Sequence, residues 1–217
     1  MDQCIMCYRL VCDVCELDQT LHNSYSSHLL SGKSLPFQMH GLYSITASVP
    51  AGSSLYSLPI ARGFSRLSTI YVTFYDGVTG TNTKWTNRFI CPNVAGESNT
   101  EINDAMSWNI TIGSERWPQF DCTSVQECAY RLRLATTAHL GNDLFSISGA
   151  SYRTDKFIIG QSFEKAPGQS SHTGINTRSG SQLSLNFRNL GDVTMVHVVL
   201  HYEQILSLSA AGAEMLD

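Results

Sequence analysis

Alternation of apolar and polar residues is the strongest pattern in the chain. In five segments an apolar side chain stands at every second position, with mostly Ser, Thr, Asn or His between. Successive side chains of a β-strand point to opposite faces, so a strand with one face on a core has this period. The pattern predicts half-buried strands over residues 43–49, 69–74, 108–112, 183–188 and 196–206.

Turn-forming residues separate these predicted strands. Gly, Pro, Asn, Ser and Thr gather at residues 50–54, 76–82 and 166–174. Short strands between such segments are typical of an antiparallel β-sandwich or barrel. Because several of the connections are long, we expect an all-β fold that is not a simple meander.

One segment has helical periodicity instead. Its apolar residues recur at positions i, i+3, i+4 and i+7, as Val125, Cys128, Ala129 and Leu132. A capping box at its start can be formed by Ser124 with Glu127 or by Thr123 with Gln126. We expect one short helix of about three turns, ending near residue 140, that covers one end or face of the sandwich.

Composition narrows the classes of function. The chain has 217 residues, which suffice for a domain with its own core. Charged residues make up only 15%, against about 25% in ordinary soluble domains. Much of the surface must therefore be neutral and polar, or be covered by neighbouring molecules. The net charge of −4 gives no electrostatic reason to expect direct nucleic-acid binding.

The N-terminal sequence suggests an intracellular protein. It has no basic start of a secretion signal, and Arg9 and Asp13 interrupt its apolar stretch. No run of 18 apolar residues occurs anywhere, so no membrane span is expected. Without a secretion signal, the seven cysteines are expected to be reduced thiols.

Four of these cysteines form the sharpest local motif, two C-x2-C pairs separated by four residues: Cys4, Cys7, Cys12 and Cys15. Thiolate pairs at this spacing can bind zinc tetrahedrally. The spacer is shorter than the dozen or more residues of common zinc ribbons, and the segment also fits an apolar strand. Structural zinc and buried or incidental thiols are thus alternative interpretations, and we favour the thiols.

Other candidate sites are weak. His197 and His201 are spaced i, i+4, but on a predicted strand they lie about 13 Å apart, too far to share a metal. No nucleophile elbow, phosphate-binding loop or dinucleotide motif occurs, so nothing selects a reaction and we expect no enzyme. Trp85 and Trp117 could stack on a glycan, although packing is the ordinary role of tryptophan.

The order of segments resembles the C-terminal barrel of double jelly-roll major capsid proteins of the Polinton, adintovirus and virophage-like group. The resemblance covers residues 17–217 and is carried by residues 48–53, 60–64, 69–74, 108–113, 152–157, 174–180, 182–187 and 196–203, with Trp117-Pro118 and the helix. It implies an eight-stranded antiparallel jelly-roll β-sandwich over residues 36–217. Residues 1–35 would then be a Cys-rich strand or linker segment that follows a first barrel.

The resemblance also implies a role. Such proteins place two barrels side by side, form trimeric capsomers and tile an icosahedral shell around DNA. The partners would be further copies, a first jelly-roll barrel, and penton or minor capsid proteins. The location would be the virion capsid, after an intracellular stage in a host cell. This sequence would be a truncated or domesticated copy, with residues 76–106 and 164–181 as contact or outward-facing loops. A jelly-roll module that binds a glycan or receptor is the alternative function.

Overall fold

The protein is described here by a computed structural model of residues 1–217. The structure describes residues 13–50, 53–76, 89–92, 105–140, 147–154, 156–164, 174–178, 180–191 and 193–216, without the side chains of 137–140. These residues belong to two compact units. The first holds the described residues within 13–37 and 206–216, and the second those within 38–205.

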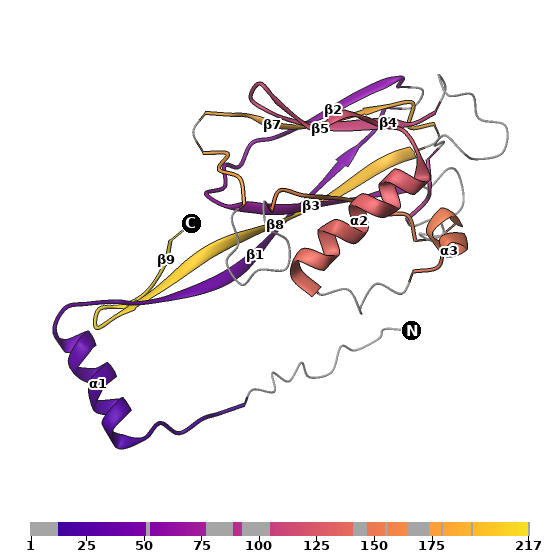
Figure 1. Cartoon of the computed structure of the whole chain (residues 1–217). Helices are drawn as coiled ribbons and strands as arrows, with labels where there is room; N and C mark the ends of the chain where they lie inside the picture. Colours follow the sequence, from indigo (N-terminus) through magenta and orange to yellow (C-terminus); the bar gives the residue numbers. More distant parts are fainter. Residues whose placement is uncertain are drawn as a thin grey trace, which may run out of the picture. The chain divides into compact units, whose positions relative to one another are not determined.

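Two antiparallel sheets form the second unit and enclose one core (Figure 1). One sheet has the order β1-β8-β3-β6, formed by Leu35–Ser48, Val193–Ser209, Leu67–Asp76 and Ile159–Ser162. The other has the order β2-β7-β4-β5, formed by Leu55–Ile60, Leu183–Arg188, Ser107–Ile112 and Glu115–Cys122. Early strands are thus paired with late ones, which is the connectivity of a jelly roll.

This arrangement confirms the predicted antiparallel jelly-roll sandwich, although its sheets have five and four strands instead of eight strands in total. A ninth strand, β9 (Gly212–Leu216), pairs with β8 and was not predicted. The five predicted strand segments lie in β1, β3, β4, β7 and β8, except that β1 ends at Ser48, one residue before the predicted end. Short strands β2, β5 and β6 escaped prediction because each presents only two or three inward positions.

The core is made by apolar residues that alternate along strands of both layers. Trp108, Ile110, Leu185 and Phe187 face it from one sheet, and Ile70, Phe74, Val196 and Val198 from the other, all at most 1% exposed. Phe74 of β3 contacts the ring of Phe187 edge to face, with ring centroids 5.6 Å apart. Apolar surface buried between the two sheets is therefore the main stabilising contribution of the fold.

Helix α2 (Val125–Leu140) starts where predicted but is longer than expected. Its 16 residues make more than four turns instead of about three. The Ser124 hydroxyl accepts a hydrogen bond from the Glu127 N–H at 3.2 Å, as one of the two proposed caps requires. The Glu127 carboxylate instead accepts bonds from Arg131 at 2.9 and 2.6 Å. The capping box is therefore only half formed.

The expectation of a single helix was also wrong. Two further helices are described, α1 (Gln19–Leu30) and α3 (Gly149–Thr154). Residues 1–35, interpreted as a strand or linker, therefore include a helix. The division at residue 35 itself stays a prediction.

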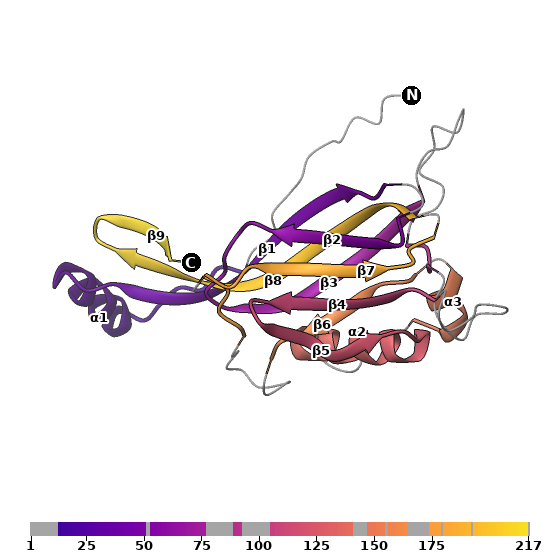
Figure 2. The same ribbon diagram turned by 90° about the horizontal axis from the view of Figure 1, so that it is seen from above.

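Helix α2 lies against β6, at the edge of its sheet (Figure 2). Gly160 of β6 permits this approach, because a Cβ atom there would lie 3.0 Å from the Cα of Leu132 and the Cβ of Ala135. The Tyr71 hydroxyl of β3 donates a hydrogen bond to the carbonyl of Ala135 at 3.2 Å. Helix α2 thus covers part of the outer face of β3 beside Tyr71. Thr69 and Thr73 are also buried, although the alternation placed them on the face opposite the core.

Tyr71 should make stability depend on alkaline pH. Burial raises the pKa of its phenol from 10.0 to about 12. Between these two values the Tyr71 phenol ionises in the unfolded state but stays protonated in the folded state. The free energy of unfolding is therefore unaffected below about pH 10 and falls as the pH rises to about 12. The loss should be about 2–3 kcal/mol. Tyr71→Phe should be less stable at neutral pH by about 1 kcal/mol, because the bond to Ala135 is gone.

The measurement is the difference between the two proteins. Urea unfolding at about pH 8 and about pH 12 should show that Tyr71→Phe loses less stability with pH than the wild type. Other titrating groups are common to both proteins and cancel. Equal losses in the two proteins would contradict the assignment.

Candidate functional site: a basic pocket at one end of the sandwich

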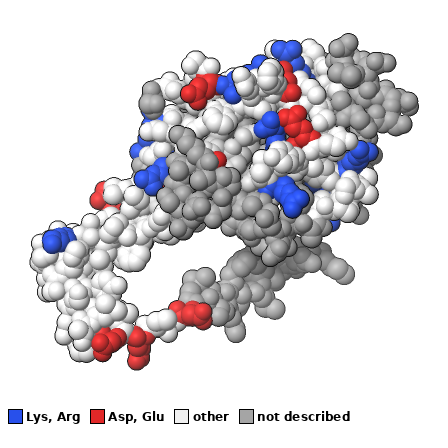
Figure 3. Space-filling view, in the orientation of Figure 1, with Lys and Arg blue, Asp and Glu red and all other residues white. Residues whose placement is uncertain are grey.

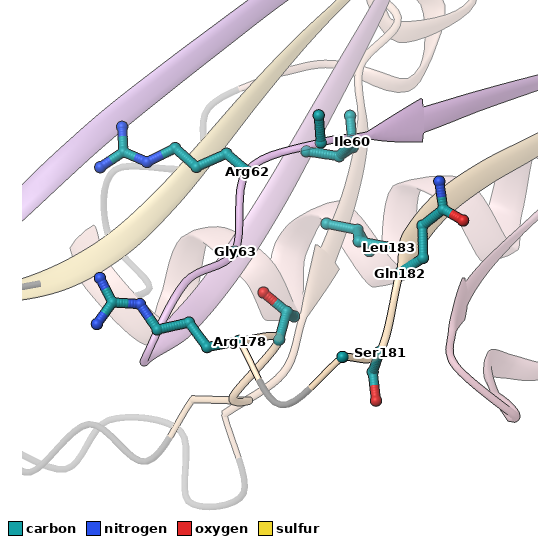
Figure 4. A pocket seen from close by; sticks show the side chains of 10 residues that line it. Ile60, Arg62, Gly63, Arg178, Ser181, Gln182 and Leu183 are labelled. Carbon is teal, nitrogen blue, oxygen red and sulfur yellow. The ribbon is translucent and has the colours of Figure 1, made fainter.

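An open pocket of about 530 Å³ lies where β2 ends and β7 begins. It is lined by the segment that follows β2, residues 60–63, and by the segment that leads into β7, residues 177–178 and 180–183. Figure 4 shows Arg62 and Arg178 extending to one side of the pocket, away from Ile60 and Leu183. Two strand ends from one sheet therefore bring two guanidinium groups to one surface.

The guanidinium of Arg62 lies among three aromatic rings. Its central carbon is 5.0, 5.2 and 4.7 Å from the ring centroids of Tyr43, Phe64 and Tyr202. It also donates a hydrogen bond to the Tyr202 hydroxyl at 3.0 Å. Cation–π contacts of this kind contribute about 0.5–2 kcal/mol each. Arg62 is thus held in a fixed orientation by strands β1 and β8 of the opposite sheet.

The pocket has binding chemistry rather than acid–base chemistry. Its lining offers two guanidinium groups, the Ser181 hydroxyl and the Gln182 amide, and the residues that line it include no carboxylate, imidazole or thiol. The Thr177 hydroxyl is engaged with the backbone of Phe64, accepting from its N–H at 2.8 Å. The arrangement suits an anionic or polar surface group of another molecule and provides no nucleophile with a neighbouring base.

A second pocket of about 530 Å³ lies at the other end of β7, lined by residues that include Arg188, Asn189, Ser107 and Thr123. Both pockets are open and border the same sheet. Sequence patterns did not point to either, because their residues come from segments far apart in the chain that only the strand pairing brings together. In the sequence, Arg62 stands out only as a close pair with Arg66, which a solvated face explains.

The cysteine motif lies almost entirely outside the described residues. Cys4, Cys7 and Cys12 are not described, and Cys15 is an exposed free thiol. Within the described part of the chain, no three His, Cys, Asp or Glu side chains gather as a metal site would require. Zinc binding by the N-terminal segment stays a hypothesis.

The two strand histidines lie where the pattern predicts. His197 and His201 are both in β8, and each ring has its own partner. The Nδ1 atom of His197 is 2.8 Å from the Thr46 hydroxyl, and that of His201 is 2.8 Å from the Ser68 hydroxyl. These separate hydrogen bonds give both imidazoles a structural role in the sheet.

Of the two tryptophans that could stack on a glycan, the structure describes only Trp117. Trp117 is half-buried in β5, packs edge to face on Phe163 at 5.7 Å and has its indole nitrogen buried. The Trp117 ring thus takes part in packing. Trp85 lies outside the described residues, as do most of the candidate contact loops 76–106 and 164–181.

Within the described part of the chain, no helix is long and apolar enough to cross a membrane.

Comparison with known proteins gives matches only among solved structures. No protein-family model and no curated protein matches the sequence. One similar structure is the VP54 protein of PBCV-1 fitted into a reconstruction of the virophage Sputnik, with a TM-score of 0.56 and 11% identity. The match covers 92% of this chain and 54% of that one. A quasi-atomic model of the PBCV-1 capsid matches with a TM-score of 0.57, 10% identity and the same coverage.

These matches support the fold. The chain spans about half the length of the capsid chains that it matches. Together with the strand order of the two sheets, the likeness identifies the fold as a jelly roll of the kind found in viral capsid proteins.

Proposed function

We propose that this chain is a structural subunit of a viral capsid, which works by association with other jelly-roll barrels rather than by catalysis. The observation that carries the proposal is the strand order β1-β8-β3-β6 over β2-β7-β4-β5, combined with a likeness over 92% of the chain to a capsid protein about twice as long. The part of that capsid protein outside the match is long enough for a second barrel. We therefore infer that the partner is a first jelly-roll barrel of the same capsomer.

The finer parts of the proposal follow the sequence resemblance. The chain would correspond to the C-terminal barrel of a double jelly-roll protein of the Polinton or virophage-like group, in a viral or domesticated copy. It would form trimeric capsomers with its first-barrel partner and meet penton or minor capsid proteins in the virion. It would be made inside the host cell and contact no nucleic acid directly.

The sparse charges on the surface support a subunit that contacts its neighbours side by side. On the face in Figure 3, uncharged residues separate the charged side chains, and basic and acidic groups are interspersed. Few charges must then be desolvated when neighbouring subunits approach. Phe120 on the outer strand β5 is 79% exposed, and Tyr130 on α2 is 63% exposed.

Helix α1 gives a more specific reason to expect a partner. It has 12 residues, none of them buried, and carries an apolar row one turn apart at Leu21, Tyr25 and Leu29. Isolated helices of this length are marginal in water, because nucleation is unfavourable and few hydrogen bonds follow it. An apolar row on such a helix is stabilised when another surface covers it. We infer that α1 packs against a barrel of a neighbouring subunit.

Light scattering of the purified chain, alone and co-expressed with a first jelly-roll barrel, tests the proposal. The mixture should give a defined complex whose mass corresponds to several barrels. A monodisperse monomer in both samples would overturn the capsid-subunit proposal.

A double substitution tests the role of α1. Leu21→Asp with Tyr25→Asp should weaken association at least tenfold, because it places two charges in the proposed contact. The melting temperature of the sandwich should change little, since neither residue is buried in it. The matched control is Asn23→Asp with Ser27→Asp, which adds the same charge to the polar side of the same helix. Equal effects of the two pairs would contradict the apolar contact.

The alternative function, binding of a glycan or receptor, has less support. Trp117 is half-buried and packs against Phe163, so at least part of its ring is used within the fold. The basic pocket around Arg62 and Arg178 is the surface that such a ligand would use. A glycan array that gives binding to this chain but not to Arg178→Ala would favour this alternative.

A further inference from the structure

Two buried cysteines meet at the corner between β5 and α2. Cys122 is the last residue of β5, and Cys128 lies in the first turn of α2. Both side chains are 0% exposed, and their sulfur atoms are 3.5 Å apart. A disulfide has an S–S distance of about 2.05 Å, so a shift of roughly 1.5 Å would bring the atoms to bonding distance. Short movements of this size are available to a corner between two elements.

We propose that Cys122 and Cys128 are a redox-active pair that forms a reversible disulfide within each subunit when a peroxide is present. No sequence motif pairs them, because the recognisable spacing belongs to the four N-terminal cysteines and this pair is spaced i, i+6. The juxtaposition arises from the turn at residues 123–124, which places the start of α2 beside the end of β5.

The surroundings distinguish the two thiols. The indole nitrogen of Trp108 donates a hydrogen bond to the Cys128 sulfur at 3.4 Å. Hydrogen bonds from Cys122 and from Trp108 lower the pKa of Cys128, although burial opposes this. The hydrogen bond to Cys128 and burial raise the pKa of Cys122. The thiolate is the nucleophilic form, and the Trp108 N–H stabilises a thiolate at Cys128 but not at Cys122. We therefore assign the attack on peroxide to Cys128 and the second step to Cys122.

The reaction has two steps and balances with hydrogen peroxide as oxidant. The Cys128 thiolate attacks one peroxide oxygen, an S–O bond forms and the O–O bond breaks, and the departing hydroxide takes up a proton to become water. The Cys122 sulfur then attacks the sulfenic sulfur of Cys128, an S–S bond forms, the S–O bond breaks and the oxygen leaves as a second water. The two thiols together lose two electrons, which reduce the peroxide.

The location gives the bond a structural consequence. Strand β5 is the outer strand of one sheet, whereas α2 packs on β6 at the edge of the other. A disulfide between Cys122 and Cys128 therefore ties the edge of one layer to the helix that covers the other layer. Closing a short loop of this kind should raise the melting temperature by about 5 °C. Because both sulfurs are buried, oxidation requires transient opening of the corner, or occurs before the corner closes during folding.

Peptide mapping tests the proposal directly. Trypsin cleaves after Arg116 and Arg131, so both cysteines lie on the single peptide 117–131. After treatment of the full chain with peroxide, folded and during refolding, and alkylation of free thiols, this peptide should carry no alkyl group. It should be about 2 Da lighter than the reduced peptide, and dithiothreitol should restore the reduced mass.

Substitutions separate this pair from the other thiols. Cys122→Ser and Cys128→Ser should each abolish the rise in melting temperature on oxidation, whereas Cys91→Ser, which removes a half-buried thiol on another peptide, should retain it. The wild-type peptide map decides the matter if a serine variant does not fold. Alkylation of both cysteines after oxidation, a mass gain of about 32 Da from sulfinic acid, or a crosslink to another cysteine would each overturn the proposal.

Discussion

Replacing Phe74 with alanine should lower the free energy of unfolding by about 3–5 kcal/mol. Phe74 is fully buried in β3 and lies where the two sheets meet. Its ring contacts Phe187 of the opposite sheet at 5.6 Å and Phe157 at 6.2 Å. Truncation removes the buried ring and leaves a cavity that the rigid strands cannot close. The expected loss is a large part of the whole stability of an ordinary domain.

Urea unfolding followed by circular dichroism measures this loss, with Phe120→Ala as the matched control. Phe120 is 79% exposed on the outer strand β5, so the same truncation there should change stability by less than about 0.5 kcal/mol. If the two variants lose similar stability, the sandwich core is not where the structure places it. A melting temperature that falls for Phe74→Ala alone would support the core assignment.

The sequence predicted those parts of the fold that depend on local periodicity. Strands β3 and β8 alternate over many residues, and Ile70, Val72 and Phe74 do face the core as the period requires. The N-terminal cap of α2 was also predictable, because Ser124 bonds to a backbone group only three residues ahead. Such features need no knowledge of the rest of the chain.

Features that depend on distant segments were missed. Strand β6 has only four residues, Ile159–Ser162, and three of them are buried, so it shows no alternation. Helix α2 packs on the outer face of β6, which would be exposed to solvent in a sandwich of two sheets alone. Helix α1 was missed for a different reason. Its apolar residues Leu21, Tyr25 and Leu29 are separated by Ser, His and Asn, so the segment was interpreted as a linker.

The candidate site was predictable only in part. The aromatic surroundings of Arg62 combine Tyr43, Phe64 and Tyr202, which are joined only when β1 and β8 pair and the segment after β2 folds over them. The Cys122–Cys128 pair likewise needs the turn into α2. By contrast, the assignment of His197 and His201 to one strand was confirmed, because strand period alone determines it.

Introducing a side chain at Gly160 should destabilise the fold by pushing α2 off β6. A Cβ atom at this position would lie 3.0 Å from the Leu132 Cα, which is backbone and cannot rotate away. The larger side chain of Gly160→Leu must therefore displace the helix or the strand, at a loss of about 3 kcal/mol. The displacement should also move the Ala135 carbonyl away from Tyr71 and expose the phenol. Because burial is what raises the pKa of Tyr71, the tyrosine should then titrate at lower pH than in the wild type.

The matched control is Gly149→Leu, at the first residue of α3, where a Cβ atom has open space and leucine favours a helix. Its stability should stay within about 0.5 kcal/mol of the wild type. Urea unfolding gives the two stabilities. Tyrosinate absorbance during an alkaline titration, compared with the same protein carrying Tyr71→Phe, separates Tyr71 from the other eight tyrosines. If Gly160→Leu were as stable as Gly149→Leu, the close contact between α2 and β6 would be wrong. The disulfide proposed between Cys122 and Cys128 would then join β5 to a helix that does not pack against β6.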